Sequence, residues 1–396
     1  MRYTQLDDDT LNAPDDFFIM EADNSTIKSS SLVFLNYGLT DDFKGKDLTN
    51  KIVVANAGDT KSDDPQSWYK ASLQKREMAK AAGAKGIIEL YYNPKSPYNF
   101  VKRFLASRKR IELGELPEGN GIFHLMVDAS NEAIVNKLKS GNSELNLTID
   151  GISKKEIESE NIVGYVEGTD PLLKEKIIVF SAHYDHVGIG VADAVGDTIY
   201  NGARDNAVGT TTVLMSAENI AKYPLRRSSM FVLFTAEEKG LLGSKWFVEE
   251  CPVELNKIKY CFNSDNGGYD DTSIATIVGK ERTTAQPVFE EACAAYGLET
   301  IDDQIGGFFD RSDNVNFAAV GIPAPTFSMG FRSFGEEIRK YYHQAGDHAD
   351  NLDYDYLDKF FRAYVLSARM IGNSDSTFFW NEGDKYYDKG IELYKD

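Results

Sequence analysis

Short apolar runs alternate with longer amphipathic segments along most of the 396-residue chain. An apolar run of roughly four to eight residues between polar turns predicts a buried strand, and apolar residues every three or four positions predict a helix. The first alternation is predicted to contain strands at 51–55, 85–90 and 121–127 and helices at 68–82 and 133–138. Repeated units of strand and helix form sheets that are covered by helices.

A second alternation begins near residue 160. Its predicted strands are 161–166, 176–180, 230–234, 258–262 and 324–327, and its predicted helices are 210–223, 240–250, 286–296 and 356–371. Parallel strands joined through helices are buried on both faces, which explains such continuous apolar runs. We therefore predict an α/β fold with a mixed, mostly parallel sheet flanked by helices, plus a smaller α/β or β-rich domain. The predicted division is an N-terminal segment 1–30, a small domain 31–153 and a large domain 154–396.

The composition excludes several classes of partner. The chain has 43 Lys and Arg against 62 Asp and Glu, a formal net charge of −19, so it lacks a basic surface for nucleic acid or anionic lipid. No apolar run approaches the roughly 18 residues that span a membrane. The first residues lack the apolar core of a signal peptide. We favour an exported protein whose signal peptide is absent from this chain, and a cytoplasmic location is the alternative. The oligomeric state cannot be read from the sequence.

Three cysteines, Cys251, Cys261 and Cys293, are too few for a disulfide framework. Three buried thiols are the expected arrangement, and a bridge between Cys251 and Cys261 is the alternative. The cysteines therefore do not decide the compartment.

The strand predicted at 176–180 leads directly into Ser-Ala-His-Tyr-Asp-His at 181–186. Two of the chain's five histidines, His183 and His186, flank Asp185 in this segment. In open α/β sheets, ligands bind at the carboxyl ends of the strands. A His-x-Asp pair at such an end indicates a metal ligand, His183, and a carboxylate that orients its ring, Asp185.

Four further polar segments follow predicted strands or precede predicted helices. Their candidate ligands are Asp205, Glu237, Glu238, Asp265 and His343. Together with His183, such side chains can hold two divalent ions about 3.5–4 Å apart if one carboxylate bridges them. Nitrogen and oxygen ligands without thiolate favour zinc, with manganese or cobalt as alternatives. One of the two adjacent glutamates is expected to bind metal, and the other to take a proton from the attacking water.

In this order, the motifs resemble peptidase family M28, the di-zinc aminopeptidases. The matching motifs are His183-x-Asp185, Gly202-Ala203-Arg204-Asp205-Asn206, Glu237-Glu238-x-Gly240-Leu241-x-Gly243-Ser244, Asn263-x-Asp265, Arg311-Ser312-Asp313, Gly321-Ile322-Pro323-Ala324 and Tyr342-His343. The resemblance covers roughly residues 160–372. Segments 45–54 and 80–88 are similar to the protease-associated (PA) domain that is often inserted in this family.

The resemblance implies a function and a role for each residue. The implied function is a zinc-dependent aminopeptidase that hydrolyses peptides with a free N-terminus. The implied ligands of two zinc ions are His183, Asp205, Glu238, Asp265 and His343, with Asp205 as the bridge. The implied catalytic residues are Glu237 as general base, Asp185 as the residue that orients His183, and Tyr342 as a hydrogen-bond donor to the oxyanion.

Three other functions stay open. A glutaminyl cyclase uses the same scaffold with one zinc ion and transfers an acyl group without hydrolysis. A carboxypeptidase acting on acidic dipeptides needs convergent arginines, for which Arg204, Arg311 and Arg332 are candidates. The non-enzymatic alternative is an interaction module in which the PA-like domain binds partners and the metal site is vestigial.

Other candidate residues have simpler structural explanations. We expect His186 to be a loop residue or a neighbour of a ligand, His124 to be half-buried and hydrogen-bonded, and His348 to be solvated. Asp347 is either a helix cap or a partner for a ligand. Three phenylalanines are candidates for an apolar pocket wall or for the core: Phe308, Phe309 and Phe331.

Overall fold

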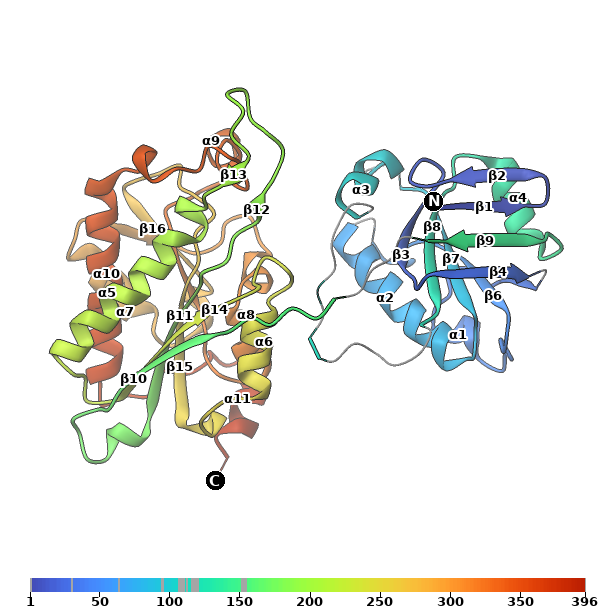
Figure 1. The fold of residues 1–396 in the computed structure, drawn as a ribbon. Coiled ribbons are helices and arrows are strands. Elements are labelled where there is room, and N and C mark those ends of the chain that lie inside the picture. The colour runs from blue at the N-terminus through green and yellow to red at the C-terminus, as the bar shows by residue number, and fades with distance from the viewer. Residues whose placement is uncertain are drawn as a thin grey trace. The chain divides into compact units, whose positions relative to one another are not determined.

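The computed structural model describes residues 2–29, 31–62, 65–93, 96–105, 111, 113–114, 121–150 and 155–395. The chain divides into two compact units, Met1–Ile157 and Glu158–Asp396 (Figure 1). Each unit has its own sheets and its own hydrophobic core. The border predicted between residues 153 and 154 lies outside the described residues.

The N-terminal unit contains a five-stranded sheet with the order β3-β8-β7-β6-β5. The strands are β3 (Phe17–Glu21), β5 (Leu32–Phe34), β6 (Ile52–Asn56), β7 (Gly86–Tyr91) and β8 (Phe123–Asp128). Strands β5 to β8 are parallel, and β3 is antiparallel to β8. The helices are α1 (Thr40–Phe43), α2 (Pro65–Ala81), α3 (Tyr98–Leu105) and α4 (Glu132–Ser140). Helix α4 begins where the Asn131 side chain accepts two backbone N–H groups, and it ends at Gly141, which has φ 73°.

A second, antiparallel sheet in this unit has the order β2-β1-β9-β4. Its strands are β1 (Arg2–Leu6), β2 (Asp9–Asn12), β4 (Ser25–Ser29) and β9 (Leu145–Ile149). Residues 2–29, which lie in the segment 1–30 predicted to be separate, belong to this unit, because β1 and β4 pair with β9 and β3 pairs with β8. Strands β2 and β4 are largely exposed, and their polar residues hide the alternation that would have revealed them.

His124 lies on β8 and is fully buried, not half-buried as expected. Its Nε2 is 2.8 Å from Oε1 of Glu89, and Nζ of Lys75 is 2.7 Å from the other carboxylate oxygen. The three side chains form a polar network inside the sheet–helix interface of this unit. Both carboxylate oxygens of Glu89 have partners in it, whereas Nδ1 of His124 has no hydrogen-bond partner among the described residues.

The C-terminal unit contains a seven-stranded sheet with the order β10-β14-β11-β15-β18-β16-β17. The strands are β10 (Ile162–Val166), β11 (Ile177–His183), β14 (Ser228–Phe234), β15 (Ile258–Ser264), β16 (Ile274–Val278), β17 (Glu299–Ile301) and β18 (Thr326–Met329). Strands β14, β11, β15 and β18 are parallel, whereas β10 and β16 are antiparallel to their neighbours β14 and β18. The predicted mixed, mostly parallel sheet is confirmed. A small hairpin, β12 (Gly188–Ile189) and β13 (Ile199–Tyr200), stands apart from it.

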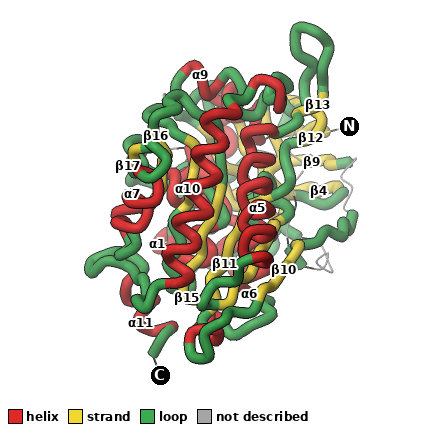
Figure 2. The backbone as a smooth tube through the Cα atoms, turned by 90° about the vertical axis from the view of Figure 1, so that its left-hand side faces the viewer, coloured by secondary structure: helices red, strands yellow, loops and turns green. Residues whose placement is uncertain are grey.

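Helices cover both faces of this sheet (Figures 1 and 2). One face packs against α5 (Val208–Lys222), α7 (Gln286–Ala294) and α10 (Tyr354–Asn373). The other face packs against α6 (Leu242–Glu249), α8 (Asn314–Ala319) and α11 (Tyr387–Leu393), while α9 (Glu336–Arg339) precedes the loop that carries His343. Every residue of β11 and β14 is buried, which explains their continuous apolar sequences.

No helix within the described ranges is both long and apolar enough to cross a membrane. All three cysteines are free thiols; Cys261 and Cys293 are buried, and Cys251 is partly exposed. The bridge between Cys251 and Cys261 is therefore not formed.

Candidate metal centre

Three neighbouring strands of the C-terminal unit end at one edge of the sheet and place polar residues there. Strand β11 ends at His183, β14 ends shortly before Glu237, and β15 ends directly before Asp265. The register pairs His183 with Phe234, the last residue of β14, so the segments that follow both strands begin level with each other. This edge is where open α/β sheets bind ligands.

Asp205 lies between the two histidines predicted to be ligands. Its Oδ1 is 3.2 Å from Nε2 of His183, and its Oδ2 is 3.1 Å from Nε2 of His343. Each carboxylate oxygen therefore faces a different imidazole. A carboxylate that bridges two metal ions has this arrangement.

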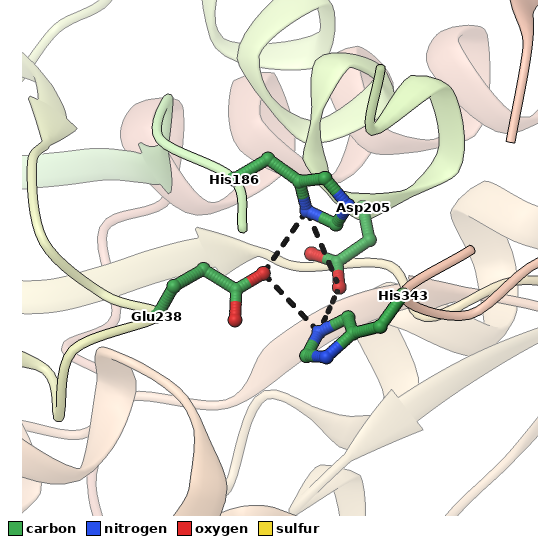
Figure 3. Close-up of side chains that lie close together, drawn as sticks. All are labelled: His186, Asp205, Glu238 and His343. Carbon is green, nitrogen blue, oxygen red and sulfur yellow. Dashed lines mark hydrogen bonds and ion pairs between the residues drawn. The ribbon is translucent and has the colours of Figure 1, made fainter. Parts of the chain in front are cut away.

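The candidate ligands form two groups, and the ligand atoms within each group lie within 4.8 Å of one another. The first group is His183, Glu237 and Asp265. The second group is His186, Asp205, Glu238 and His343 (Figure 3). The structure thus brings together all five predicted ligands and Glu237, and it adds His186.

Asp185 holds the backbone of the two glutamates rather than the ring of His183. Its Oδ1 accepts the N–H of Glu237 at 3.0 Å, and its Oδ2 accepts the N–H of Glu238 at 3.3 Å. Nδ1 of His183 lies 3.0 Å from the backbone carbonyl oxygen of Asp185 but 3.7 Å from its carboxylate. The carbonyl oxygen of Asp185 therefore makes the short contact with the ring, while its carboxylate accepts two backbone N–H groups and stays within ion-pair distance of the same nitrogen.

Asp347 joins the loop that carries His343 to the segment that carries Asp205. Its Oδ2 accepts the backbone N–H groups of Arg204 at 2.9 Å and of Asp205 at 3.4 Å, and its Oδ1 pairs with the Arg204 guanidinium at 2.9 Å. The same guanidinium donates to the side-chain oxygen and the carbonyl oxygen of Asn351. Of the two alternatives for Asp347, the structure supports the partner of a ligand segment over the helix cap.

An Asp347→Asn variant is expected to lower the free energy of unfolding of the C-terminal unit by about 2 kcal/mol, since a lost hydrogen bond to a charged group costs about that much. The side-chain NH2 group of the new asparagine would face N–H groups of Arg204 and Asp205, which are also donors. The hydrogen bonds between Arg204 and Asn351 would remain. Urea denaturation of the metal-free protein measures the change. The exposed Asp350 supplies the control, because Asp350→Asn should change stability by less than about 0.5 kcal/mol. An Asp347→Asn protein as stable as wild type would contradict this assignment.

The buried carboxylates control the charge of the site. Burial opposes protonation of His183, but the charge of Asp265 and the hydrogen bond to Asp205 outweigh it and raise its pKa well above the ordinary value. The pKa of His343 is raised to about 9, because the hydrogen bond to Asp205 and the charge of the nearby Glu238 outweigh burial. Burial and the charge of Asp265 raise the pKa of Glu237 well above its ordinary value. The site therefore holds protons that a divalent cation would displace.

The donor set fits zinc. Both groups contain imidazole nitrogens and carboxylate oxygens and no thiolate. The Oε1 atom of Glu238 is buried and has no hydrogen-bond partner in the described parts of the chain. A buried acceptor of this kind, aimed at the imidazole of His343 from 3.2 Å, is suited to a cation.

A pocket opens beside the two groups. Its apolar lining consists of Val278, Phe308, Phe331, Phe334 and Ile338. Tyr342 also lines it, and its ring stacks on His343 with the centroids 4.0 Å apart. Of the two alternatives, pocket wall and core, Phe308 and Phe331 belong to the pocket wall. Phe309 packs against Trp380 in the core.

The three candidate arginines do not converge. Arg311 lines the pocket, Arg204 is buried against Asp347, and Arg332 pairs with Asp271. Recognition of an acidic dipeptide by several arginines is thus not supported.

From the sequence, His186 was expected to be a loop residue or a neighbour of a ligand, and Asp313 was assigned no role. Asp313 is fully buried, its carboxylate oxygens have no hydrogen-bond partner in the described ranges, and burial raises its pKa to about 7. The spacing His-x-Asp-His is the signal that could have indicated His186. His348, expected to be solvated, has a side chain that is 40% exposed.

The chain is similar to known peptidases. A curated relative, "probable leucine aminopeptidase 2" from Aspergillus oryzae (strain ATCC 42149 / RIB 40), is 26% identical over 362 residues, which are 82% of this chain and 66% of the relative. The chain spans less than two thirds of the length of the first curated relatives it matches.

Two solved structures show the same fold. The aminopeptidase from Aneurinibacillus sp. strain AM-1 has a TM-score of 0.62 at 20% identity, covering 95% of this chain and 82% of that chain. BSAP, a zinc aminopeptidase from Bacillus subtilis, has a TM-score of 0.52 at 20% identity, covering 98% of this chain and 83% of that chain. The family model "Peptidase family M28" matches residues 161–368, more than half of the sequence. The chain therefore belongs to peptidase family M28.

Proposed function

We propose that this protein is a zinc-dependent aminopeptidase that uses two zinc ions to remove N-terminal residues from peptides. The observation that carries the proposal is the position of Asp205, whose two oxygens lie 3.2 Å from His183 and 3.1 Å from His343. The names of the similar proteins, "probable leucine aminopeptidase 2" and a zinc aminopeptidase, support it.

His183 and Asp265 would hold one ion, Glu238 and His343 the other, and Asp205 both. When bound, the two ions would lower the pKa of a water molecule and polarise the scissile carbonyl group. Two separate groups of ligands argue for two ions and against the single ion of a glutaminyl cyclase.

Glu237 would take the proton of the attacking water and pass it to the leaving amine. Its carboxyl group lies beside His183 and Asp265, and Asp185 fixes its backbone at 3.0 Å. Burial, followed by the charge of Asp265, raises the pKa of Glu237 well above its ordinary value. The hydroxyl of Tyr342, at the pocket wall, would donate a hydrogen bond to the developing oxyanion.

The pocket suggests the class of substrate. Its aromatic and aliphatic wall suits a large apolar side chain at the N-terminus of the peptide. The carboxylates of Glu237, Glu238 and Asp265 line the same pocket and would hold the free α-amino group.

A panel of amino-acid anilides tests the function. We expect turnover that needs bound zinc, that disappears on treatment with a chelator and that returns with zinc. Leucine and phenylalanine anilides should be cleaved at least about 10-fold more efficiently, in kcat/KM, than alanine anilide, because each methylene in an apolar pocket contributes about 1–3 kcal/mol. The N-acetylated anilides serve as the control and should not be cleaved. A protein that has two zinc ions bound and hydrolyses none of these substrates would exclude the proposal.

We propose further that the N-terminal unit is a PA domain. The two segments that resemble one, 45–54 and 80–88, contribute to β6 and β7, which are paired in parallel. Their adjacency supports the match.

A further inference from the structure

We propose that His186 is an additional metal ligand, so that the position formed by Asp205, Glu238 and His343 is closed by a fourth protein side chain. The inference rests on the metal centre proposed above and goes beyond the five ligands that the family resemblance implies. With His186 as a ligand, the two metal positions would have different numbers of protein ligands, because the position of His183 and Asp265 has no second imidazole.

The distances between the four side chains fit a common ion. Nδ1 of His186 is 3.0 Å from Oε1 of Glu238, which is 3.2 Å from Nε2 of His343. Nε2 of His343 is 3.1 Å from Oδ2 of Asp205, and this oxygen is 4.0 Å from Nδ1 of His186. Figure 3 shows these four atoms around one space. A tetrahedral zinc ion with bonds of about 2.0–2.1 Å separates its ligand atoms by about 3.3 Å. Three of the four distances are close to this value, and that between His186 and Asp205 is longer.

Nδ1 of His186 and Oε1 of Glu238 lie at ion-pair distance, but their geometry is not that of a hydrogen bond. Both ring nitrogens of His186 and Oε1 of Glu238 are buried without a hydrogen-bond partner among the described residues. The side chains are only 9% and 7% exposed, so water does not readily satisfy them. An unsatisfied buried polar group costs about 1–3 kcal/mol. A cation between Nδ1 and Oε1 would satisfy both atoms at once.

The backbone at Gly202 leaves space for the imidazole ring of His186. Gly202 precedes the Asp205 segment with φ 65°, and a Cβ atom there would lie 2.7 Å from Cγ of His186. Only glycine leaves room for the ring against this segment. On its other side the ring meets His343 edge to face, with centroids 5.4 Å apart. The two imidazoles thus approach the shared space from different directions.

Four protein ligands are typical of closed metal sites, whereas catalytic positions keep three and leave one place for water or substrate. The position that includes His186 would therefore bind the first ion tightly. The position of His183 and Asp265 would stay open for chemistry and lose its ion more easily. Asp205 belongs to both positions and couples them.

The test compares His186→Ala and His186→Gln with His348→Ala. His348 is a matched control because it lies outside both groups and contacts Asn201 and Asp197 instead. Each full-length protein is stripped of metal, checked for wild-type circular dichroism, and titrated with Co²⁺ and with Zn²⁺ against a competing chelator. We expect wild type to bind two ions with unequal affinity. Both His186 variants should lose roughly 100-fold or more in the tighter affinity, while His348→Ala is unchanged.

A count of imidazoles separates ligation from an indirect role. X-ray absorption of protein loaded with one equivalent of zinc should show two imidazoles in wild type and one in His186→Gln. Added imidazole should restore the visible absorption of Co²⁺-loaded His186→Ala. Unchanged affinity in either folded variant would overturn the inference, and so would weakened binding with an unchanged imidazole count. A wild-type protein that binds no ion would instead refute the proposed function itself.

Discussion

A Glu237→Gln variant is expected to lose about 10³-fold in kcat, within the range that removal of a general base produces, while keeping its zinc. Glutamine has the same shape as glutamate but cannot accept the proton of water and pass it on. The contact between the backbone N–H of residue 237 and Asp185 does not involve the side chain, so the loop should stay in place. Steady-state kinetics on leucine anilide, together with metal analysis of the same samples, measures both quantities.

The adjacent Glu238 makes this test discriminating. Glu238 lies with His343 and Asp205, so Glu238→Gln should lower zinc content as well as activity. Glu250→Gln, at an exposed position, is the neutral control. Loss of metal from Glu237→Gln but not from Glu238→Gln would show that Glu237 is the metal ligand and Glu238 the general base. Full activity in Glu237→Gln would show that another group takes the proton.

The candidate ligands at strand ends could be predicted from the sequence, because the apolar run of a buried strand stops where the strand ends. Strand β11 is buried at every position, so its apolar run is unbroken until the polar residues that lead to His183. The same pattern indicates Glu237 after β14 and Asp265 after β15. No strand directly precedes His343, so the strand-end pattern does not indicate this residue, and the order of the family motifs supports it as a candidate.

Contacts that depend on loop conformation could not be predicted. The turn after β11 directs His186 back towards Glu238, and it directs the Asp185 carboxylate to two backbone amides. Neither direction follows from hydrophobic periodicity, because that pattern only describes which face of a strand or helix is buried. Strands β2 and β4 were missed for a related reason, since partly exposed strands carry little apolar pattern. Strand β3 is mostly buried, and its short apolar run, Phe17 to Met20, is the signal that could have indicated it.

The polar network in the N-terminal unit has consequences for stability. Lys75 on α2, Glu89 on β7 and His124 on β8 are all fully buried. The ammonium group of Lys75 lies 2.7 Å from the Glu89 carboxylate and donates to the carbonyl oxygen of Asn56 at 2.8 Å. A buried charge that loses its partner is strongly unfavourable, whereas replacement of the whole network by apolar side chains need not be.

The pKa of Glu89 gives the network a pH dependence. Burial alone would raise this pKa, but the hydrogen bond to His124 and the charge of Lys75 outweigh it and lower the pKa from 4.5 to about 2. A lowered folded-state pKa stabilises the protein above the unfolded pKa and ceases to do so as the pH falls through the folded value. The contribution of Glu89, of the order of 3 kcal/mol, should therefore be complete above about pH 4.5 and disappear towards pH 2.

A Lys75→Met variant should destabilise the N-terminal unit by about 3–5 kcal/mol at neutral pH, because it leaves the Glu89 carboxylate buried without its cation. Urea denaturation, with hydrogen exchange of the β7 and β8 amides to assign the transition, measures the change. Lys70→Met, at an exposed position of the same helix, should cost less than about 0.5 kcal/mol. Combining Lys75→Met with Glu89→Leu and His124→Leu should recover most of the loss, since no charge is then left unpaired. Equal stability of the Lys75→Met and Lys70→Met proteins would mean that the network contributes nothing to folding.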